Sequence, residues 1–482
     1  MSLPAVSFRD PAGKCFLSGG RVLRVLDREG ATQAEAFLRT TRARAWLDGG
    51  QIVGTRRLGG EEWAGLRELP GIGPALDAGG WGAVYEHERV PFASYPYEWP
   101  PEMLWEAGRL TLELARAGLP DGYSLKDATP YNVLFRGSKA VFIDVPSFEP
   151  RTPGDPVWQP YAQFVRTFLL PLLANRYWGL RLADVFTTRR DGLEPEEVYA
   201  WCGPLRRLQP QVLSLISMPT WLGGRARARG QGLYSPRRMG DPERALFVVE
   251  SLLRQLERSL GALKPRQLRG STWSNYMDAH SYEEPAFAAK ERFIDELVKE
   301  FKPRRVLDVG ANTGHFSVRV AQTGAAVVAV DLDPTCVGAL WRRAQEQKLN
   351  ILPLVVDIAR PSPGVGWRNR ECHSFLERAA GGFDAVLMLA LIHHLLVTER
   401  IPLEDILRLA AELTTSLVVM EFVSPQDGMF QQLTRGREGL HATVDEAAFE
   451  RACAPHFEIV RSLPLPGTRR RMYGLKKKGS SG

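Results

Sequence analysis

The sequence predicts an α/β fold whose C-terminal part is a largely parallel sheet with helices on both faces. Three observations support this prediction. Val306 and Leu307, with Val309, form a short apolar run of the kind expected for a strand buried on both faces. A glycine turn, Gly310–Gly314, ends this run abruptly. After a helical stretch, a second buried strand is expected at Ala325–Val330, and it ends on Asp331.

The turn after the first strand is expected to bind a ligand. Glycines there allow positive φ angles and a close approach of the backbone. The helix that follows presents free N–H groups to a carboxylate or phosphate. Asp331 follows the glycines by about twenty residues, at the tip of the second strand, where an acid holds the hydroxyls of a nucleoside ribose.

The turn itself reads DVGANTG, from Asp308 to Gly314, and resembles motif I of the class I S-adenosylmethionine (SAM) dependent methyltransferases. Three later stretches resemble further elements of that family in order: VVAVDLDP, LPLVVDI (Leu352–Ile358) and FDAVLMLALIHHL (Phe383–Leu395). The resemblance implies a Rossmann-like methyltransferase domain at 270–478, with SAM as its cofactor. A doubly wound domain that binds another nucleotide, or none, is the alternative.

The resemblance also implies which residues hold the cofactor. Asp308 should border its methionine part, Asp331 should accept from the ribose hydroxyls, and Asp357 should accept from the adenine amine. Tyr276, Tyr282 and Lys290 precede the glycine turn and are candidate lid or carboxylate contacts. The full predicted set is Asp308, Gly310, Ala311, Asn312, Gly314, Asp331, Leu332, Asp357, Ile358, Leu389 and Tyr282.

The predicted acceptor side follows the fourth strand, at His393 and His394. Methyl transfer mainly requires alignment of donor and acceptor. A neutral imidazole, with a pKa near about 6.5, can remove a hydroxyl proton near pH 7. Alternatively, one histidine caps the next helix and the other is packed. Glu421 lies near the end of the predicted strand Leu417–Phe422. It is a third catalytic candidate and is expected to orient the substrate. The turn lacks the acidic or amide-proline sequence typical of amine methylation, which favours oxygen as the acceptor.

The N-terminal part contains SLKDATPYNVLFRGSKAVFIDVPSFEP, from Ser124 to Pro150, which resembles the catalytic segment of protein kinases and aminoglycoside phosphotransferases. The resemblance implies catalytic and magnesium-binding roles for Asp127, Asn132 and Asp144. However, Asp144-Val-Pro replaces the magnesium-binding triplet, and no strand lysine or convincing phosphate loop precedes the segment. We expect an α+β, kinase-like and degenerate domain at 1–158, with live phosphotransfer and a coincidental hairpin as alternatives.

Other elements follow from hydrophobic periodicity. A strand is predicted at Arg21–Leu26 and helices at Gln33–Leu47, Glu102–Ala117 and Pro285–Phe301. Residues 159–269 are predicted to be a helical segment with a linker. A closing antiparallel hairpin is expected at Phe457–Leu465 and Arg470–Lys476.

Composition narrows the class of protein. The chain has 482 residues, 44% hydrophobic, with a formal net charge of 62 − 55 = +7. The five cysteines show no metal-binding spacing, so neither a disulfide framework nor a metal site is expected. No signal peptide or membrane span is evident, which favours a cytoplasmic protein without membrane contact. The sequence leaves the oligomeric state open.

Taken with SYPYEW at Ser94 and LKDATPYN, the methyltransferase motifs make the whole chain resemble a bacterial family of class I methyltransferases likened to nodulation proteins. We expect O-methylation of a small-molecule or glycan-like hydroxyl, with the N-terminal domain shaping the acceptor site. The alternatives are an RNA methyltransferase, a bifunctional kinase and methyltransferase, and a non-catalytic SAM-binding scaffold.

Overall fold

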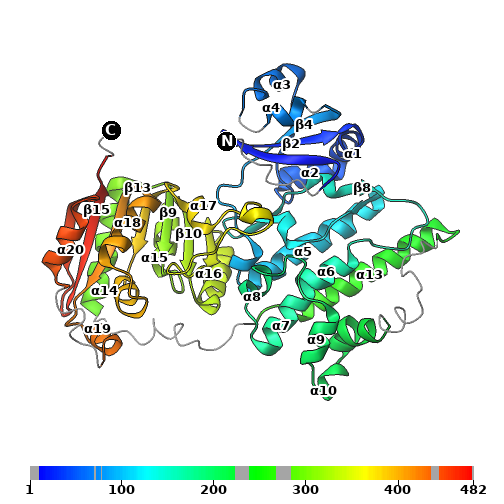
Figure 1. Cartoon of the computed structure of the whole chain (residues 1–482). Helices are drawn as coiled ribbons and strands as arrows, with labels where there is room; N and C mark the ends of the chain where they lie inside the picture. Colours follow the sequence, from blue (N-terminus) through cyan, green and yellow to red (C-terminus); the bar gives the residue numbers. More distant parts are fainter. Residues whose placement is uncertain are drawn as a thin grey trace. The chain divides into compact units, whose positions relative to one another are not determined.

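The computed structural model describes residues 10–69, 72–77, 79–222, 238–266, 284–435 and 444–479. The chain divides into two compact units. The first comprises residues 1–136, 140–266 and 365–372, and the second comprises 137–139, 267–364 and 373–482. Figure 1 shows both units. Tyr276, Tyr282 and most of the 223–238 segment lie outside the described residues.

The first unit begins with a small antiparallel sheet and continues into helices. Its four-stranded sheet has the order β1-β2-β4-β3, and two-stranded sheets pair β5 with β8 and β6 with β7. The strands are β1 (Gly13–Ser18), β2 (Arg21–Asp27), β3 (Thr55–Arg57), β4 (Trp81–His87), β5 (Tyr123–Leu125), β6 (Val133–Arg136), β7 (Lys139–Phe142) and β8 (Phe148–Pro150).

The helices of the first unit flank this sheet and form the segment that follows it. They are α1 (Arg28–Leu38), α2 (Thr41–Gly49), α3 (Gly60–Leu66), α4 (Gly73–Asp77), α5 (Pro101–Gly118), α6 (Tyr161–Phe164), α7 (Leu170–Trp178), α8 (Leu182–Phe186), α9 (Pro195–Trp201), α10 (Pro204–Arg207), α11 (Pro210–Val212) and α13 (Pro242–Ala262). The predicted helix at Glu102–Ala117 is therefore confirmed as α5, and the strand at Arg21–Leu26 as β2.

The single helix predicted at Gln33–Leu47 is wrong, because the chain forms α1 and α2 there. Thr40 has an extended backbone, and its side chain accepts a hydrogen bond from the N–H of Ala43 at 3.1 Å. A threonine that caps a helix start in this way competes with continuation of the preceding helix. Because the residues on both sides of Thr40 are rich in alanine and favour a helix, the sequence pattern predicted one continuous helix and gave no sign of the cap.

The second unit is a seven-stranded sheet in the order β11-β10-β9-β12-β13-β15-β14, in which only β15 runs antiparallel to its neighbours β13 and β14. The strands are β9 (Arg305–Val309), β10 (Ala326–Asp331), β11 (Ile351–Val355), β12 (Phe383–Met388), β13 (Thr414–Val423), β14 (Phe457–Pro464) and β15 (Arg470–Lys477). The helices are α14 (Glu284–Phe301), α15 (His315–Gln322), α16 (Pro334–Glu346), α17 (Phe375–Ala379), α18 (Leu403–Leu413), α19 (Gly428–Leu433) and α20 (Glu446–Cys453).

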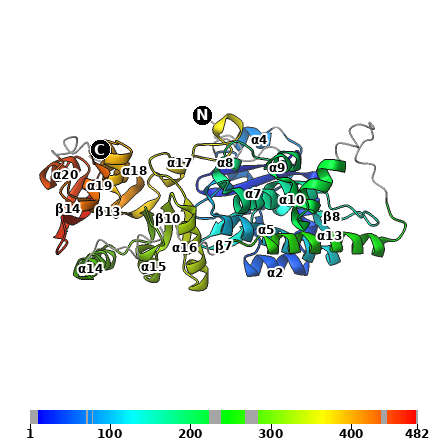
Figure 2. The ribbon, with the colours of Figure 1, turned by 90° about the horizontal axis from the view of Figure 1, so that it is seen from below.

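Helices cover both faces of this sheet, as Figure 2 shows with α14, α15 and α16 on one side and α18 and α20 on the other. The first three pack on alternate strand residues in one apolar cluster that includes Leu297, Val318, Leu340, Val327 and Val419. Ile406, Leu407 and Ala410 of α18 are buried on the opposite side. This is a Rossmann-like fold, in which ligands bind outside the carboxyl ends of the parallel strands at the point where strand order reverses. Here that point lies between β9 and β12.

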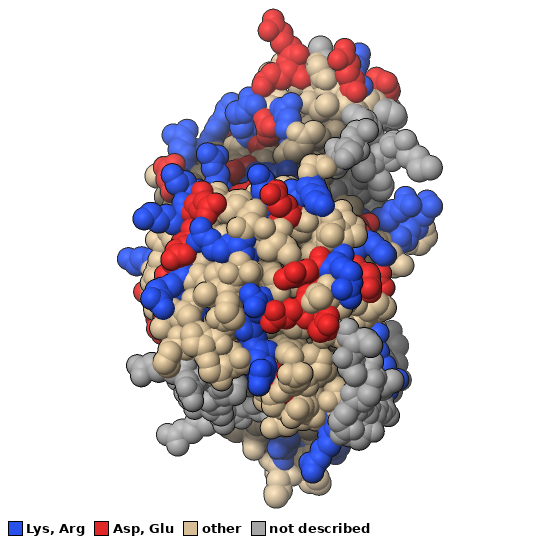
Figure 3. All heavy atoms as spheres, turned by 90° about the vertical axis from the view of Figure 1, so that its left-hand side faces the viewer, with Lys and Arg blue, Asp and Glu red and all other residues tan. Residues whose placement is uncertain are grey.

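Surface charge is mixed. On the face drawn in Figure 3, basic and acidic side chains are interspersed rather than gathered into one continuous basic patch. Among the described residues, no helix combines the length and hydropathy that a bilayer crossing requires.

Candidate functional site

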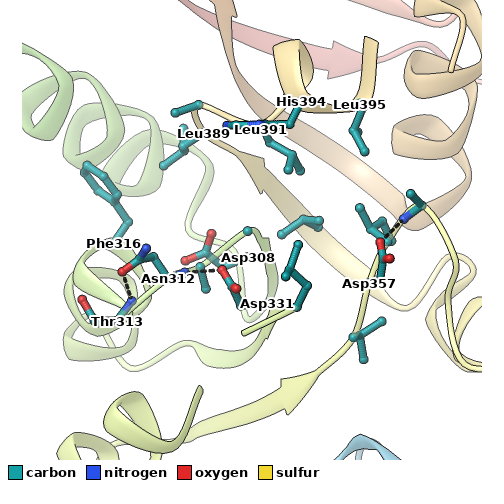
Figure 4. Close-up of a pocket in the computed structure, with 18 of the residues that line it drawn as sticks. Asp308, Asn312, Thr313, Phe316, Asp331, Asp357, Leu389, Leu391, His394 and Leu395 are labelled. Carbon is teal, nitrogen blue, oxygen red and sulfur yellow. Dashed lines mark hydrogen bonds between the residues drawn. The ribbon is translucent and has the colours of Figure 1, made fainter. Parts of the chain in front are cut away.

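A pocket of about 370 Å³ opens at the carboxyl ends of β9, β10, β11 and β12. This volume lies within the range of about 300–1,000 Å³ that is usual for cofactor and small-molecule sites. Its walls come from the glycine turn, from the residues that follow β10 and β11, from the turn after β12, and from α14 and α19. The pocket is drawn in Figure 4.

The glycine turn forms one wall because its backbone can fold tightly. Gly310 and Gly314 have φ angles of 75° and 78°. The N–H groups of Gly310 and Ala311 donate to the carbonyl of Val330, at 2.8 and 3.0 Å, so the turn is fixed to the end of β10. A Cβ atom on Gly314 would lie 2.1 Å from a methyl carbon of Leu340, so only glycine fits there. Gly314 does not line the pocket, and its contribution is to the packing of α15 against α16.

Asp331 joins the tips of β9 and β10. Its carboxylate accepts from the N–H of Asn312 at 2.8 Å and from the N–H of Asp333 at 2.9 Å. Figure 4 shows the hydrogen bond from Asn312 and places Asp331 beside Asp308 and Asn312. Each carboxylate oxygen has a second lone pair, so Asp331 keeps the capacity to accept from a ligand hydroxyl. Burial raises its pKa, while the backbone donors act in the opposite sense.

Asp308 is buried in β9, with 3% of its surface exposed. The hydroxyl of Ser317 donates to its carboxylate at 2.6 Å. Burial raises the pKa of Asp308 to about 6, and the hydrogen bond from Ser317 opposes that rise. An acid of this pKa beside a pocket is poised to ionise fully when a cation binds next to it.

The far end of the pocket is formed by Asp357 and its neighbours (Figure 4). Asp357 accepts from the N–H of Ala359 at 3.0 Å and pairs with Arg360 at 2.8 Å. Arg360 also pairs with Glu399, which lines the pocket as well. Leu332 and Ile358 supply apolar surface at this end, which suits a planar ring with one exocyclic donor.

The turn after β12 brings a histidine to the pocket. His394, the first residue of the short helix η9 (His394–Thr398), lines it, as do Leu389 and Leu391 of the turn. Ala390, between them, has a φ of 50°, a conformation that a residue with a Cβ rarely adopts outside sites that require it. Burial and the charge of Arg470 lower the pKa of His394, so its ring is neutral at pH 7.

His393 and Glu421 are not among the pocket residues, and both side chains are fully buried. Neither ring nitrogen of His393 has a hydrogen-bond partner. Burial, the neighbouring His394 and Arg470 lower the pKa of His393 to about 3. Glu421 instead holds Lys290, whose ammonium nitrogen lies 2.6 Å from its carboxylate.

Lys290 lines the pocket together with Phe287 and Phe316, and Figure 4 shows Phe316 on the side opposite Asp357. Its nitrogen lies 5.0 Å from the centre of the Phe316 ring. Several other lining residues were not predicted from the sequence: Phe287, Phe316, Leu391, Leu395, Thr398, Glu399 and Leu433. Helix periodicity placed Phe287 and Phe316 in predicted helices, but no local pattern marked any of these residues as pocket residues, because they come from segments that are separate in sequence.

The sheet order, the glycine turn and the acids after β9, β10 and β11 together define the second unit as a class I SAM-dependent methyltransferase, with SAM as its cofactor. The match of residues 268–454 to a family model described as a methyltransferase domain agrees with this assignment.

The chain is 29% identical, over 478 residues, to "Nodulation protein NoeA" of Rhizobium meliloti (strain 1021), an alignment that covers 98% of this chain and 96% of that protein. Among solved structures, the magnesium protoporphyrin IX methyltransferase ChlM from Synechocystis PCC 6803 is 16% identical and covers 44% of this chain and 93% of that one, with a TM-score of 0.30. The N-methyltransferase NodS from Bradyrhizobium japonicum WM9 is 12% identical and covers 41% and 99%, with a TM-score of 0.31. Neither structure bears on the acceptor of this chain.

Proposed function

We propose that this protein transfers the methyl group of SAM to a hydroxyl group of a small-molecule or glycan-like acceptor. The observation that carries the proposal is His394, a neutral imidazole in the wall of the cofactor pocket and on the turn after β12. A neutral ring accepts the proton that an attacking hydroxyl must lose. An amine acceptor that arrives neutral has less need of such a base.

The cofactor supplies a methyl group bonded to a sulfonium, and the residues of the chain bind and align it. Asp331 accepts from the ribose hydroxyls, and Asp357 accepts from the adenine amine. Asp308 faces the positive charge of the methionine part. Lys290 pairs with its carboxylate, since a buried ammonium group in the pocket wall favours an anion.

With the cofactor bound, the acceptor oxygen would take the methyl group as its bond to sulfur breaks. His394 would take the hydroxyl proton on a ring nitrogen. His393 does not take the proton, because its ring is fully buried. Glu421 acts through Lys290 and not on the acceptor.

The first unit is proposed to shape the acceptor site and to be a degenerate kinase-like module. Support for degeneracy comes from Asp144, which pairs with Arg24 of β2 at 2.7 Å. The carboxylate of Asp127 accepts from the amide of Gln163 at 3.2 Å. Both acids that the resemblance assigns to phosphotransfer thus already have protein partners.

The test is methyl transfer from SAM with an isotopically labelled methyl group to metabolite extracts, with the His394→Gln variant as the control. We expect a labelled methyl ether or ester that forms with the native protein and at a much lower rate with the variant. Label on nitrogen would contradict the hydroxyl acceptor. Nuclease-sensitive label would instead identify RNA, which the mixed charge of the face in Figure 3 does not favour.

A further inference from the structure

Four charged side chains form a continuous buried chain in the second unit. Lys290 donates to Glu421 at 2.6 Å, and Arg470 donates to the other oxygen of Glu421 at 3.3 Å. Arg470 also donates twice to Asp427, at 2.9 and 3.2 Å. All four residues are buried, with exposures of 3%, 0%, 4% and 9% for Lys290, Glu421, Arg470 and Asp427.

Stability alone is a poor reason for such a chain. Burying two cations and two carboxylates costs hydration free energy that their attraction only partly offsets, and apolar residues of similar volume often stabilise a fold as well or better. The pairs are nevertheless well formed, and Arg470 meets Asp427 through two parallel hydrogen bonds, which fixes orientation as well as distance. The arrangement therefore indicates a role in positioning.

The two ends of the chain reach two parts of the same pocket. Lys290 lines the pocket from α14, near Asp308 and Phe316. Asp427 caps the start of α19, where it accepts from the N–H of Met429 at 2.9 Å. Helix α19 packs against η9, which begins with His394, and its last residue, Leu433, lines the pocket. The buried chain thus connects the cofactor side of the pocket to the element that supports the acceptor side.

We propose that Arg470 and Asp427 are positioning residues of the methyltransferase, which fix α19 beside the histidine turn and, through Glu421, couple its position to the carboxylate of the bound cofactor. This inference rests on the contact proposed between Lys290 and that carboxylate. When an anion shares the donors of Lys290, Glu421 is less strongly held by Lys290 and interacts more strongly with Arg470. The Arg470–Asp427 pair carries that change to α19.

The experiment measures two quantities on the full chain with S-adenosylhomocysteine: affinity by calorimetry, and amide hydrogen exchange of segment 424–434, which reports local opening. In the native protein, we expect the ligand to slow exchange of this segment by about tenfold or more, because it stabilises the closed arrangement. The analogue that lacks the α-carboxylate should bind but leave the exchange rate unchanged.

Asp427→Asn is the decisive variant. An asparagine still caps α19, so only the charge toward Arg470 is lost. We expect it to bind S-adenosylhomocysteine within about threefold of the native affinity, since it does not line the pocket, yet to lose the slowing of exchange. The matched control is Asp445→Asn, at the exposed cap of α20, where Asp445 accepts from the N–H of Ala448 at 2.7 Å. The control should respond as the native protein does.

Unchanged exchange in the native protein with ligand bound would overturn the proposal, and so would a full response in Asp427→Asn or with the decarboxylated analogue. If Asp427→Asn does not fold, Arg470→Lys replaces it, because lysine keeps the charge and loses the paired donors. The same loss of response is then expected. Absence of S-adenosylhomocysteine binding by the native protein would instead contradict the cofactor contacts proposed above.

Discussion

Among single residues, Asp331 carries the sharpest expectation for cofactor affinity. Asp331→Asn keeps one acceptor oxygen and removes the charge, so we expect S-adenosylhomocysteine to bind about 1–3 kcal/mol more weakly, the scale of a hydrogen bond to a charged group. Calorimetry measures this loss. The control is Asp295→Asn, a surface carboxylate that pairs with Arg319. Equal affinity in Asp331→Asn and native protein would exclude the ribose contact.

Asp308 predicts how cofactor affinity depends on pH. Its pKa of about 6 lies above the usual value for an aspartate because of burial. A nearby cationic ligand favours the ionised form, so affinity should rise between about pH 5 and pH 7 and then level off. Calorimetry across this range is the measurement, and Asp308→Asn should abolish the rise. A flat profile in the native protein would contradict it.

The raised pKa of Asp308 also predicts that the stability of the fold without ligand decreases with pH, whereas cofactor affinity increases. An acid whose folded pKa is raised stabilises the fold below its unfolded pKa, and this contribution is lost as pH increases through the folded value. For Asp308 the loss falls between about pH 4 and pH 7. Asp308→Asn without ligand should therefore melt at a higher temperature than native protein at pH 7.5. A lower melting temperature would show that its charge supports the fold.

The two histidines should respond differently to substitution. His394→Gln is expected to lower turnover by about 10²–10⁴, the usual contribution of a general base, with unchanged affinity for S-adenosylhomocysteine. His393→Leu removes two unpartnered buried nitrogens and should be neutral or stabilising, with turnover retained. Turnover and melting temperature distinguish them. A loss of turnover confined to His393→Leu would reverse the assignment.

Among the elements, the segment between β5 and β8, which includes the hairpin of β6 and β7, carries the acids that resemble a phosphotransfer site. Asp144 is paired with Arg24 of β2 at 2.7 Å, and the carboxylate of Asp127 accepts from the amide of Gln163. We expect no magnesium-dependent phosphate transfer from ATP, measured as labelled phosphate in co-purified metabolites. Transfer that Asp127→Asn abolishes would make the protein bifunctional.

The sequence predicted elements correctly where hydrophobic periodicity is strong. It failed where a helix cap determines where one helix ends and the next begins. Helix α14 and the hairpin of β14 and β15 formed close to their predicted bounds, because each has a regular apolar stripe or alternation. The division between α1 and α2 was missed, because one threonine hydroxyl determines it. The buried chain from Lys290 to Asp427 was also missed, since its members are distant in sequence.

For the whole molecule, we expect the second unit to bind the cofactor without the first. The fragment 267–482 should match the native affinity for S-adenosylhomocysteine, because the described residues of the pocket all lie in the second unit. It should fail to methylate the acceptor that the full chain uses, since the first unit is proposed to shape the acceptor site. Unchanged kcat/KM in the fragment would identify the first unit as an independent module.

The sequence by itself predicted the methyltransferase class and several of the residues that line the pocket. Asp308, Gly310 and Asp331 follow one another within a single strand-turn-helix-strand unit, so local spacing is enough to place them. The tertiary structure decided which histidine lines the pocket. His393 and His394 are adjacent and chemically alike, yet the ring of His393 is fully buried and that of His394 lies in the pocket wall. Burial depends on contacts between distant elements, which spacing along the chain does not encode.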